Sequence, residues 1–228
     1  MIALRSDVRE LLLPLVQQWA ESRLPAGRPL AGGRGGAAAF DLSAGLSVVL
    51  RPCRRGGLVS RVNREVYFGW RPRPWRELVV TEALRSRGVA TVEMLGASVR
   101  WMGPLWYRGA VVSREISAAL NLWRHLETVA PAARVRACER AAAVIRRMHD
   151  AGVVHPDLNL QNFLVREDKA GPEVLVIDLD RARLAPARKA DREAAFLRLQ
   201  RSVRRLDPQR RIVTSECLTA LRAIGEVG

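Results

Sequence analysis

A short polar motif in the second half of the chain combines residue types that carry out chemistry in proteins. The segment HPDLNLQN places Asp157 two residues after His155 and five residues before Asn162. An apolar, strand-like piece follows, and after a polar turn a second apolar piece, VLVIDLD, contains Asp178. Carboxylate and amide oxygens are the hard ligands that Mg²⁺ prefers. A carboxylate on a loop can also orient a hydroxyl group by accepting its proton.

These residues match the needs of phosphoryl transfer from ATP. That reaction requires metal-held phosphates, a carboxylate that orients the attacking hydroxyl, and a cation on the phosphates. Asp157 would face the hydroxyl, while Asn162 and Asp178 would share Mg²⁺, because a hairpin brings its two ends together. Any one of these residues alone is more often a turn cap. The joint pattern H-x-D-x-x-x-x-N, strand, I-D-x-D is far more specific.

The composition is that of a globular protein with an excess of positive charge. The chain has 228 residues, is 48% hydrophobic and carries a formal net charge of +15. It can bury a real core, and its charge favours an anionic partner such as a nucleotide, a nucleic acid, an anionic lipid or a phosphorylated sugar. The alternative is an arginine-rich proteome, because lysine occurs only at Lys169 and Lys189.

The cysteines and the apolar N-terminal run exclude some classes of protein. Cys53, Cys138 and Cys217 are widely spaced and form neither a metal motif nor a disulfide framework, which favours a reducing cytosol. The run LLLPLV near the N-terminus is short and interrupted by proline, so it is neither a signal peptide nor a membrane span.

The elements that must position the motif form two parts of different composition. The first part is predicted to hold a helix at 5–22, strands at 46–53, 92–101 and 105–116, and a second helix at 76–88. The second part is predicted to hold the hairpin and helices at 118–127, 132–150, 191–206 and 214–224. The helix at 132–150 places Cys138, Ala141, Ile145 and Met148 on one face.

We therefore predict an α+β fold in two lobes. Residues 1–29 are expected to form a leader helix and linker, residues 30–117 a small β-rich lobe, and residues 118–228 a mainly helical lobe with the hairpin. Glycines at 32, 33, 35 and 36 lie before the strand at 46–53. They would form either a turn that covers phosphate or a plain flexible linker, since glycine permits close backbone approach.

The motif resembles the catalytic and metal-binding loops of protein-kinase-like phosphotransferases. Their common patterns are HRDxxxxN and DFG, whereas HPDLNLQN and IDLD are closer to the lipopolysaccharide kinase family. Segments of the first half, including VVLRPCRRGGLVSRV, YFGWRPRPWREL and LWYRGAVVSREI, are similar to the 3-deoxy-D-manno-octulosonic acid (Kdo) kinases of that family. The resemblance covers roughly residues 30–206 in the same order.

The resemblance implies a role for each matching residue. Asp157 becomes the catalytic carboxylate with His155 bracing its loop, and Asn162 and Asp178 become Mg²⁺ ligands, assisted by Asp180. The nucleotide-binding positions that it implies are Gly32, Gly33, Gly35, Arg51, Glu77 and Glu115. The cofactors would be ATP and Mg²⁺.

The sequence also departs from the usual kinase pattern. Arg51 stands where most kinases have a strand lysine, and arginine can bind Glu77 and phosphates in a bidentate manner. Leu179 replaces the phenylalanine of the metal loop, and Pro156 replaces the middle residue of the catalytic loop. No activation segment or APE motif follows Asp178, which favours a small-molecule or lipid kinase over a regulated protein kinase.

The leading hypothesis is an ATP- and Mg²⁺-dependent kinase of the Kdo residue of a lipid A precursor. Such an acceptor is an anionic glycolipid, so we expect a cytoplasmic protein that is peripheral on the inner membrane. The basic, tryptophan-bearing stretch from Arg54 to Arg76 suits an anionic membrane surface, or else is a solvated insertion.

Two other hypotheses stay open. A heptose kinase of the same fold would have the same hairpin and differ only in its acceptor contacts. A pseudokinase or basic binding module is disfavoured, because a binder has no need of Asp157, Asn162 and Asp178 together. No nucleic-acid partner is expected, since aromatic residues make up only 5% of the chain and no nucleic-acid motif is present.

Overall fold

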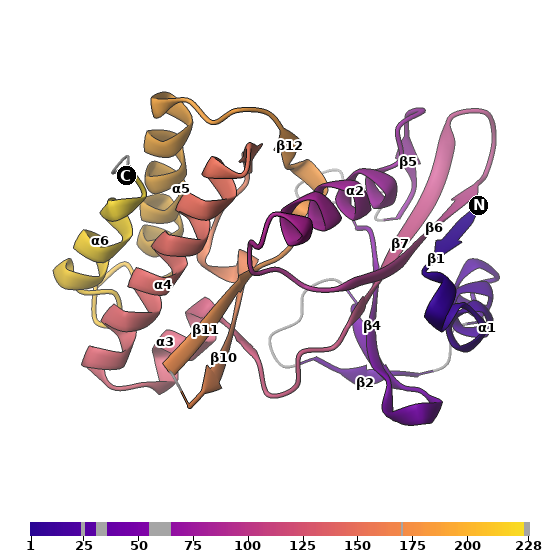
Figure 1. Cartoon of the computed structure of the whole chain (residues 1–228), viewed down its shortest axis with the longest axis horizontal. Coiled ribbons are helices and arrows are strands. Elements are labelled where there is room, and N and C mark those ends of the chain that lie inside the picture. Colours follow the sequence, from indigo (N-terminus) through magenta and orange to yellow (C-terminus); the bar gives the residue numbers. More distant parts are fainter. Residues whose placement is uncertain (24–25, 31–35, 55–64, 170, 226–228) are drawn as a thin grey trace. The chain divides into compact units, whose positions relative to one another are not determined.

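The computed structural model describes residues 1–23, 26–30, 36–54, 65–169 and 171–225 (Figure 1). The chain forms two compact units. The first consists of residues 1–82 and 93–115, and the second of residues 83–92 and 116–228. One unit is dominated by a sheet and the other by helices, so the predicted α+β class is confirmed.

The first unit is built on an antiparallel sheet with the strand order β1-β6-β7-β4-β3-β2, and β5 pairs with β7. In that order the strands are Ile2–Leu4, Met94–Trp101, Trp106–Arg114, Ser47–Pro52, Ala38–Asp41 and Arg28–Pro29, with β5 at Tyr67–Phe68. In β4, buried and half-buried residues alternate, so the strand presents one face to the core.

The N-terminal segment is part of this unit rather than a separate leader. β1 pairs with β6, and helix α1 (Arg9–Ala20) buries Leu12, Val16 and Trp19 in a cluster with sheet residues such as Val48 and Leu50. The helix is shorter than the predicted 5–22, because a 3-10 turn occupies residues 6–8. The sequence pattern gave the amphipathic helix but not the sheet against which its apolar face packs.

The second unit contains α3 (Leu122–Thr128), α4 (Pro131–Asp150), α5 (Lys189–Leu206) and α6 (Ser215–Arg222), while α2 (Arg73–Ser86) crosses from the first unit. Helix α4 packs against α6 and β11. Its predicted apolar face is confirmed, since Cys138, Ala141, Ile145 and Met148 are fully buried.

The predicted hairpin is also present. β10 (Phe163–Asp168) and β11 (Gly171–Val176) pair antiparallel along their whole length, and β8 (Leu120–Asn121) adds to β10. A second small ribbon joins β9 (Val153–Val154) to β12 (Arg183–Leu184). These two-residue strands were not predicted, because two residues carry no periodicity.

The helix predicted at 118–127 begins later than expected. Ala118 has a positive φ of 56°, which is incompatible with a right-handed helix. Asn121 then caps α3 by accepting a hydrogen bond from the backbone N–H of Arg124 at 3.0 Å.

Within the described parts of the chain, no helix has the length and apolar character needed to cross a bilayer.

Candidate active site

The loop that carries Asp157 is fixed by local hydrogen bonds. The side chain of Asn159 accepts from the N–H of Gln161 at 2.9 Å, which starts a short 3-10 turn over Leu160–Asn162. The N–H of Leu160 donates to the hydroxyl of Ser202 on α5 at 3.2 Å. A buried hydroxyl on a neighbouring helix therefore anchors the loop, and nothing in the local motif indicated that contact.

His155 holds the backbone of Asp157 through a hydrogen bond. Its ring is buried, and Nδ1 accepts a hydrogen bond from the N–H of Asp157 at 3.2 Å. Burial lowers the pKa of His155 to about 4, so at neutral pH the ring is neutral and its proton sits on Nε2. The side chain of Asp157, in contrast, is 62% exposed. The backbone of Asp157 is held in place while its carboxylate is available to a ligand.

The hairpin brings Asn162 and Asp178 to its open end. The N–H of Ile177 donates to the carbonyl of Asn162 at 2.8 Å, directly beyond the pairing of Phe163 with Val176. Asp178 directly follows Ile177, the residue that is hydrogen-bonded to Asn162, so Asp178 lies at the same end of the hairpin as Asn162. The sequence predicted this approach from the hairpin alone.

Each of the two side chains has a feature that suggests a ligand-binding role. The Oδ1 atom of Asn162 is buried and makes no hydrogen bond to any described residue. A buried acceptor without a partner is costly in a folded protein, by roughly 1–3 kcal/mol. Asp178 has left-handed backbone angles, φ 63° and ψ 52°, and strain of that kind concentrates at functional sites.

These residues fit a Mg²⁺ ion that is shared with a substrate. The described residues contain no cluster of three or more His, Cys, Asp or Glu side chains able to hold a metal by themselves. Mg²⁺ sites in phosphotransferases typically use one or two protein oxygens, with water and phosphate completing the shell. The unpartnered oxygen of Asn162 beside Asp178 suits such a site. Asp180 follows in the same 3-10 turn and is half-buried.

Arg181 is a neighbour of Asp157 that the sequence pattern did not single out. Its Nη1 atom lies 3.7 Å from Oδ2 of Asp157, and its side chain is 55% exposed. The turn that starts at Asp178 places it there. The spacing of residues in the sequence does not predict the left-handed backbone at Asp178. The contact between Arg181 and Asp157 could therefore not be predicted from the sequence.

In the first unit, Arg51 and Glu77 form an ion pair. Arg51 lies on β4 opposite Val111 of β7, and its guanidinium donates to Oε1 of Glu77 on α2. Glu77 is 3% exposed, so its charge depends on this cation. The pairing expected from the resemblance is present, with arginine in place of lysine.

Glu115 is held firmly by the first unit. Its carboxylate accepts two hydrogen bonds from Arg28, at 2.7 and 3.0 Å, and its N–H donates to the carbonyl of Ser47 at 2.9 Å. The backbone N–H of Glu115 is therefore already hydrogen-bonded within the unit and is not free to bind a nucleotide. A contact of Glu115 with a nucleotide, as predicted, would have to use its carbonyl.

The predicted phosphate-loop residues Gly32, Gly33 and Gly35 lie outside the described residues. Gly36, the next glycine, has a φ of +78°. That backbone angle favours glycine, whereas the guanidinium of Arg54, 2.7 Å from the place of a Cβ atom, could move aside. The stretch that contains all four glycines connects the adjacent antiparallel strands β2 and β3.

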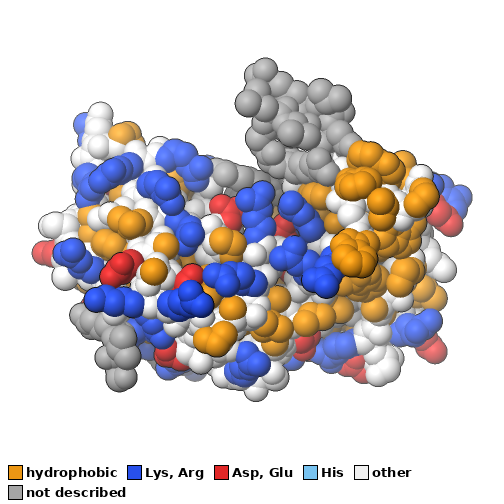
Figure 2. All heavy atoms as spheres, turned by 90° about the horizontal axis from the view of Figure 1, so that it is seen from above, with side chains coloured by type: hydrophobic (Ala, Val, Ile, Leu, Met, Phe, Trp, Pro, Cys, Tyr) orange, Lys and Arg blue, Asp and Glu red, His pale blue; other side chains and the backbone are white. Residues whose placement is uncertain are grey.

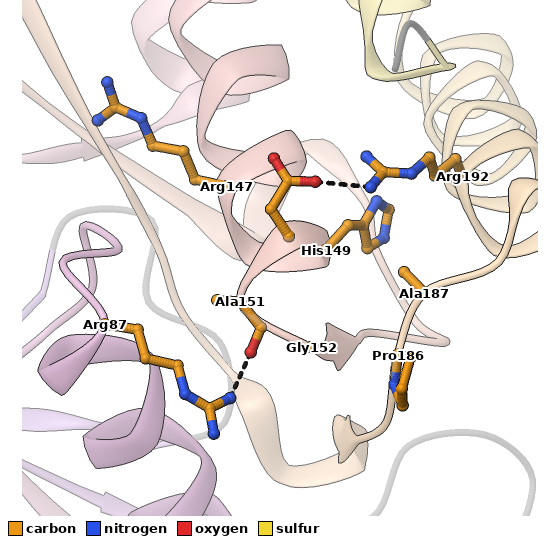
Figure 3. Close-up of a pocket in the computed structure, with 9 residues that line it drawn as sticks. Arg87, Arg147, His149, Ala151, Gly152, Pro186, Ala187 and Arg192 are labelled. Carbon is orange, nitrogen blue, oxygen red and sulfur yellow. Dashed lines mark hydrogen bonds and ion pairs between the residues drawn. The ribbon is translucent and has the colours of Figure 1, made fainter. Parts of the chain in front are cut away.

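A separate pocket in the second unit has a volume of about 840 Å³, and none of the predicted site residues that the structure describes lines it (Figure 3). Two of its arginines already have partners. Arg192 binds the carboxylate of Asp150 at 2.6 Å, and Arg87 donates to the carbonyl of Ala151. Asp157 does not line this pocket, so the pocket is not the candidate active site.

The fold and the comparisons with known proteins together define a phosphotransferase with a protein-kinase-like fold. A solved structure described as "WaaP in complex with acyl carrier protein" superposes with a TM-score of 0.62 at 20% identity, covering 97% of this chain and 88% of that one. This likeness concerns the fold. The model of the "Lipopolysaccharide kinase (Kdo/WaaP) family" matches residues 22–219, and the chain belongs to that family.

Curated relatives agree with the family assignment. A "3-deoxy-D-manno-octulosonic acid kinase" of Xanthomonas campestris pv. campestris (strain B100) is 34% identical over 194 residues, covering 83% of this chain and 73% of the relative. A protein of the same name from Stenotrophomonas maltophilia (strain R551-3) is 32% identical over 213 residues, covering 92% and 80%. The chain is thus a phosphotransferase with an alcohol group as acceptor, and the resemblance seen in the sequence is confirmed.

Proposed function

We propose that this protein transfers the γ-phosphoryl group of ATP to a hydroxyl of Kdo in a lipid A precursor. The relatives' names supply the acceptor, since the matched proteins are called 3-deoxy-D-manno-octulosonic acid kinases. The observation that carries the proposal is the arrangement in the second unit. An exposed carboxylate, Asp157, is fixed through its backbone near an unpartnered oxygen, Asn162 Oδ1, and the strained Asp178.

Asp157 is the group that acts on the acceptor. Its carboxylate accepts a hydrogen bond from the attacking hydroxyl, orients that hydroxyl and takes its proton as the new P–O bond forms. The neutral ring of His155 holds the N–H of Asp157, so the backbone that carries the carboxylate does not have to be ordered during the reaction.

Asn162 and Asp178 are the proposed Mg²⁺ ligands. When bound, the ion neutralises the charge on the phosphates of ATP. The rigid hairpin keeps the two side chains at its end, and the carbonyl of Asn162 is tied to the residue before Asp178 at 2.8 Å. Their oxygens are therefore positioned before any ligand arrives.

Arg51 is the proposed cation on the nucleotide phosphates. Its ion pair with Glu77 holds the guanidinium at the end of β4, and a planar fork with several donors suits phosphate oxygens. The glycine-bearing stretch between β2 and β3 would cover the phosphates, as the resemblance implies.

A heptose of the lipopolysaccharide core remains the second candidate acceptor. The catalytic residues would be the same for either sugar, so only the acceptor contacts separate the two. A lipid-linked acceptor in either case places the reaction at the cytoplasmic face of the inner membrane, which we propose as the site of action.

A transfer assay with radiolabelled ATP tests the proposal. Purified Kdo–lipid A precursor, heptosylated core and a generic protein are offered side by side, with Asp157→Asn as the inactive control. We expect label in the Kdo precursor that depends on Mg²⁺. Label in the heptosylated core alone would assign the second acceptor, and label in protein alone would refute both.

A further inference from the structure

Exposed hydrophobic side chains gather at one edge of the sheet of the first unit. Two come from β5 and the residues after it, two from the turn between β6 and β7, and one from the start of β7. With their exposed fractions they are Phe68 (58%), Trp70 (78%), Met102 (57%), Leu105 (39%) and Trp106 (46%). We call these five residues the aromatic edge. Soluble proteins seldom expose so many large apolar side chains in one place unless the surface binds something.

The aromatic edge is a single built surface, although its parts are more than 30 residues apart in the sequence. Phe68 is paired with Trp106 between β5 and β7, and their rings meet edge to face with centroids 5.0 Å apart. The N–H of Gly69 donates to the carbonyl of Leu105, and that of Met102 to the carbonyl of Trp106, both at 2.8 Å. The apolar groups are therefore held in place by the backbone.

The core beneath this edge is filled by side chains from the opposite face of the same strands. Tyr67 and Tyr107 are buried, stack on each other with centroids 5.6 Å apart and belong to a cluster with Cys53 and Val99. Strand alternation then points the next residues outward. Figure 2, which views the molecule from the top of Figure 1, shows hydrophobic side chains gathered on this side with Lys and Arg side chains beside them.

The segments that form the aromatic edge are basic. Segments 66–76 and 94–114 contain no Asp or Glu, and their basic residues are Arg71, Arg73, Arg76, Arg100, Arg108 and Arg114, of which Arg108 pairs with Glu65 and Arg114 with Glu93 just outside the segments. The guanidinium of Arg71 lies over the ring of Trp70, 5.5 Å from its centroid. Indole and phenyl rings with adjacent arginines are the composition that settles at the headgroup level of an anionic membrane.

We propose that the aromatic edge docks on an anionic lipid leaflet and inserts its rings among the headgroups. The inference deepens the proposed function, because an enzyme with a lipid-linked acceptor must reach the membrane surface. It differs from the expectation drawn from the sequence, which centred on the stretch from Arg54 to Arg76. The turn between β6 and β7 and the first residue of β7 now supply three of the five apolar groups.

Vesicle sedimentation of the full chain tests the docking. The test variant combines Trp70→Ser, Met102→Ser and Trp106→Ser. The control variant combines Val79→Ser and Leu197→Ser, which remove side chains that are 56% and 55% exposed at other places. Circular dichroism and thermal melting check that both variants fold. A second test variant, Trp70→Ser with Met102→Ser, spares the ring contact with Phe68.

We expect the parent and the control to bind phosphatidylcholine vesicles that contain phosphatidylglycerol, and to bind pure phosphatidylcholine weakly. The test variants should lose about tenfold or more in partitioning, since burying even one large apolar side chain is worth roughly that factor. Parental binding by both test variants, or equal binding to neutral vesicles, would overturn the proposal. So would a concentration-dependent dimer that only the test variants lose, because the edge would then join two copies.

Phosphoryl transfer separates this inference from the proposed function. The test variants should label a water-soluble, deacylated Kdo acceptor as well as the parent does, and should label the vesicle-embedded acceptor poorly. If the parent labels no Kdo acceptor but still binds anionic vesicles through the aromatic edge, the proposed function fails and the docking surface stands. If transfer to both acceptors falls equally, the edge serves the fold or the active site and docking is refuted.

Discussion

The two units differ in whether their candidate functional groups have partners within the protein. In the first, Glu77 is buried and its charge is met by Arg51 within the fold. In the second, Asp157 is exposed and the buried oxygen of Asn162 makes no hydrogen bond to a described residue. The buried charge of Glu77 is therefore met inside its own unit, whereas the buried oxygen of Asn162 remains for a ligand to satisfy. Substitutions in the first should act on stability and positioning, and those in the second on chemistry and metal dependence.

Asp157→Asn is the change with the largest expected effect. An amide keeps the size of the side chain but cannot take the proton of the hydroxyl, so the turnover number should fall by about 100-fold or more. ATP binding and thermal stability should stay close to those of the parent, because the side chain is exposed and makes only a surface ion pair. Steady-state kinetics and ATP titration measure both quantities. A variant with parental turnover would remove Asp157 from the mechanism.

Removal of the proposed metal ligands should come next in size. Asp178→Ala should raise the Mg²⁺ concentration needed for half-maximal activity by roughly 10-fold or more, and Asn162→Ala by less, because the carboxylate neutralises more of the ion's charge. Asn162→Ala also deletes the unpartnered oxygen, so it should not destabilise the metal-free protein as a buried polar deletion usually does. Mg²⁺ titrations of activity and urea denaturation in EDTA test the two statements. Unchanged Mg²⁺ dependence in both variants would refute the assignment.

The arrangement of these candidate site residues could be predicted from the sequence because their geometry is local. Asp157 and Asn162 share one loop, and Asp178 is brought back by a hairpin whose strands show in the apolar pattern. The buried face of α4 could be predicted for the same reason, since helical periodicity identifies it.

Features that depend on distant pairing could not be predicted. Nothing in the first residues indicates that β1 pairs with β6, and Phe68 and Trp106 become neighbours only through the pairing of β5 with β7. The pair of Arg51 with Glu77 spans 26 residues and was expected from the resemblance, not from any local signal. Arg181 reaches Asp157 because of the left-handed backbone at Asp178, which no spacing rule gives for a non-glycine residue.

A double-mutant cycle on Arg51 and Glu77 tests whether the two residues stabilise each other within the first unit. Arg51→Met leaves the buried charge of Glu77 without this cation and should cost about 2 kcal/mol of unfolding free energy. Adding Glu77→Gln should restore part of that loss, so the two effects should not add. Arg51→Lys, which keeps the charge, is the control and should lose less. Urea denaturation measures all four proteins, and strict additivity would show that the pair contributes no coupling.

Buried histidines should make the second unit sensitive to acid. Burial, assisted by Arg192 and Arg198 and opposed by Asp150 and Asp191, lowers the pKa of His149 to about 4. Between roughly pH 6.5 and pH 4 the unfolded chain binds a proton that the folded protein does not, so stability falls as the pH falls. By pH 5 this histidine should account for up to about 2 kcal/mol.

His149→Leu isolates that contribution. The variant should lose less unfolding free energy than the parent between pH 7.5 and pH 5, whatever its absolute stability at the higher pH. Urea denaturation at the two pH values gives the difference. Equal losses in parent and variant would show that His149 does not titrate in this range.

The smallest expected effect concerns Arg181, which lies 3.7 Å from Asp157 and is 55% exposed. An exposed ion pair of this kind contributes at most about 1 kcal/mol, so a substrate can replace it without much cost. Any hydroxyl held by Asp157 would come within reach of this guanidinium, and an acidic sugar carries a carboxylate that could take over the pair. Arg181→Gln should therefore raise the KM for an acidic sugar acceptor by up to about fivefold while leaving the KM for ATP unchanged.

Arg183→Gln is the matched control, because Arg183 is also 55% exposed but pairs with Asp191 at 3.2 Å. The decisive comparison uses an acceptor whose carboxyl group is methylated. If Arg181 recognises the carboxylate, its removal should affect the acid and leave the ester unchanged, and added salt should weaken the difference because the pair is open to solvent. A fall in the turnover number that is equal for acid and ester would mean that Arg181 orients Asp157 instead. In that case Arg181 would position a functional group within its own unit, as Glu77 positions Arg51 in the first.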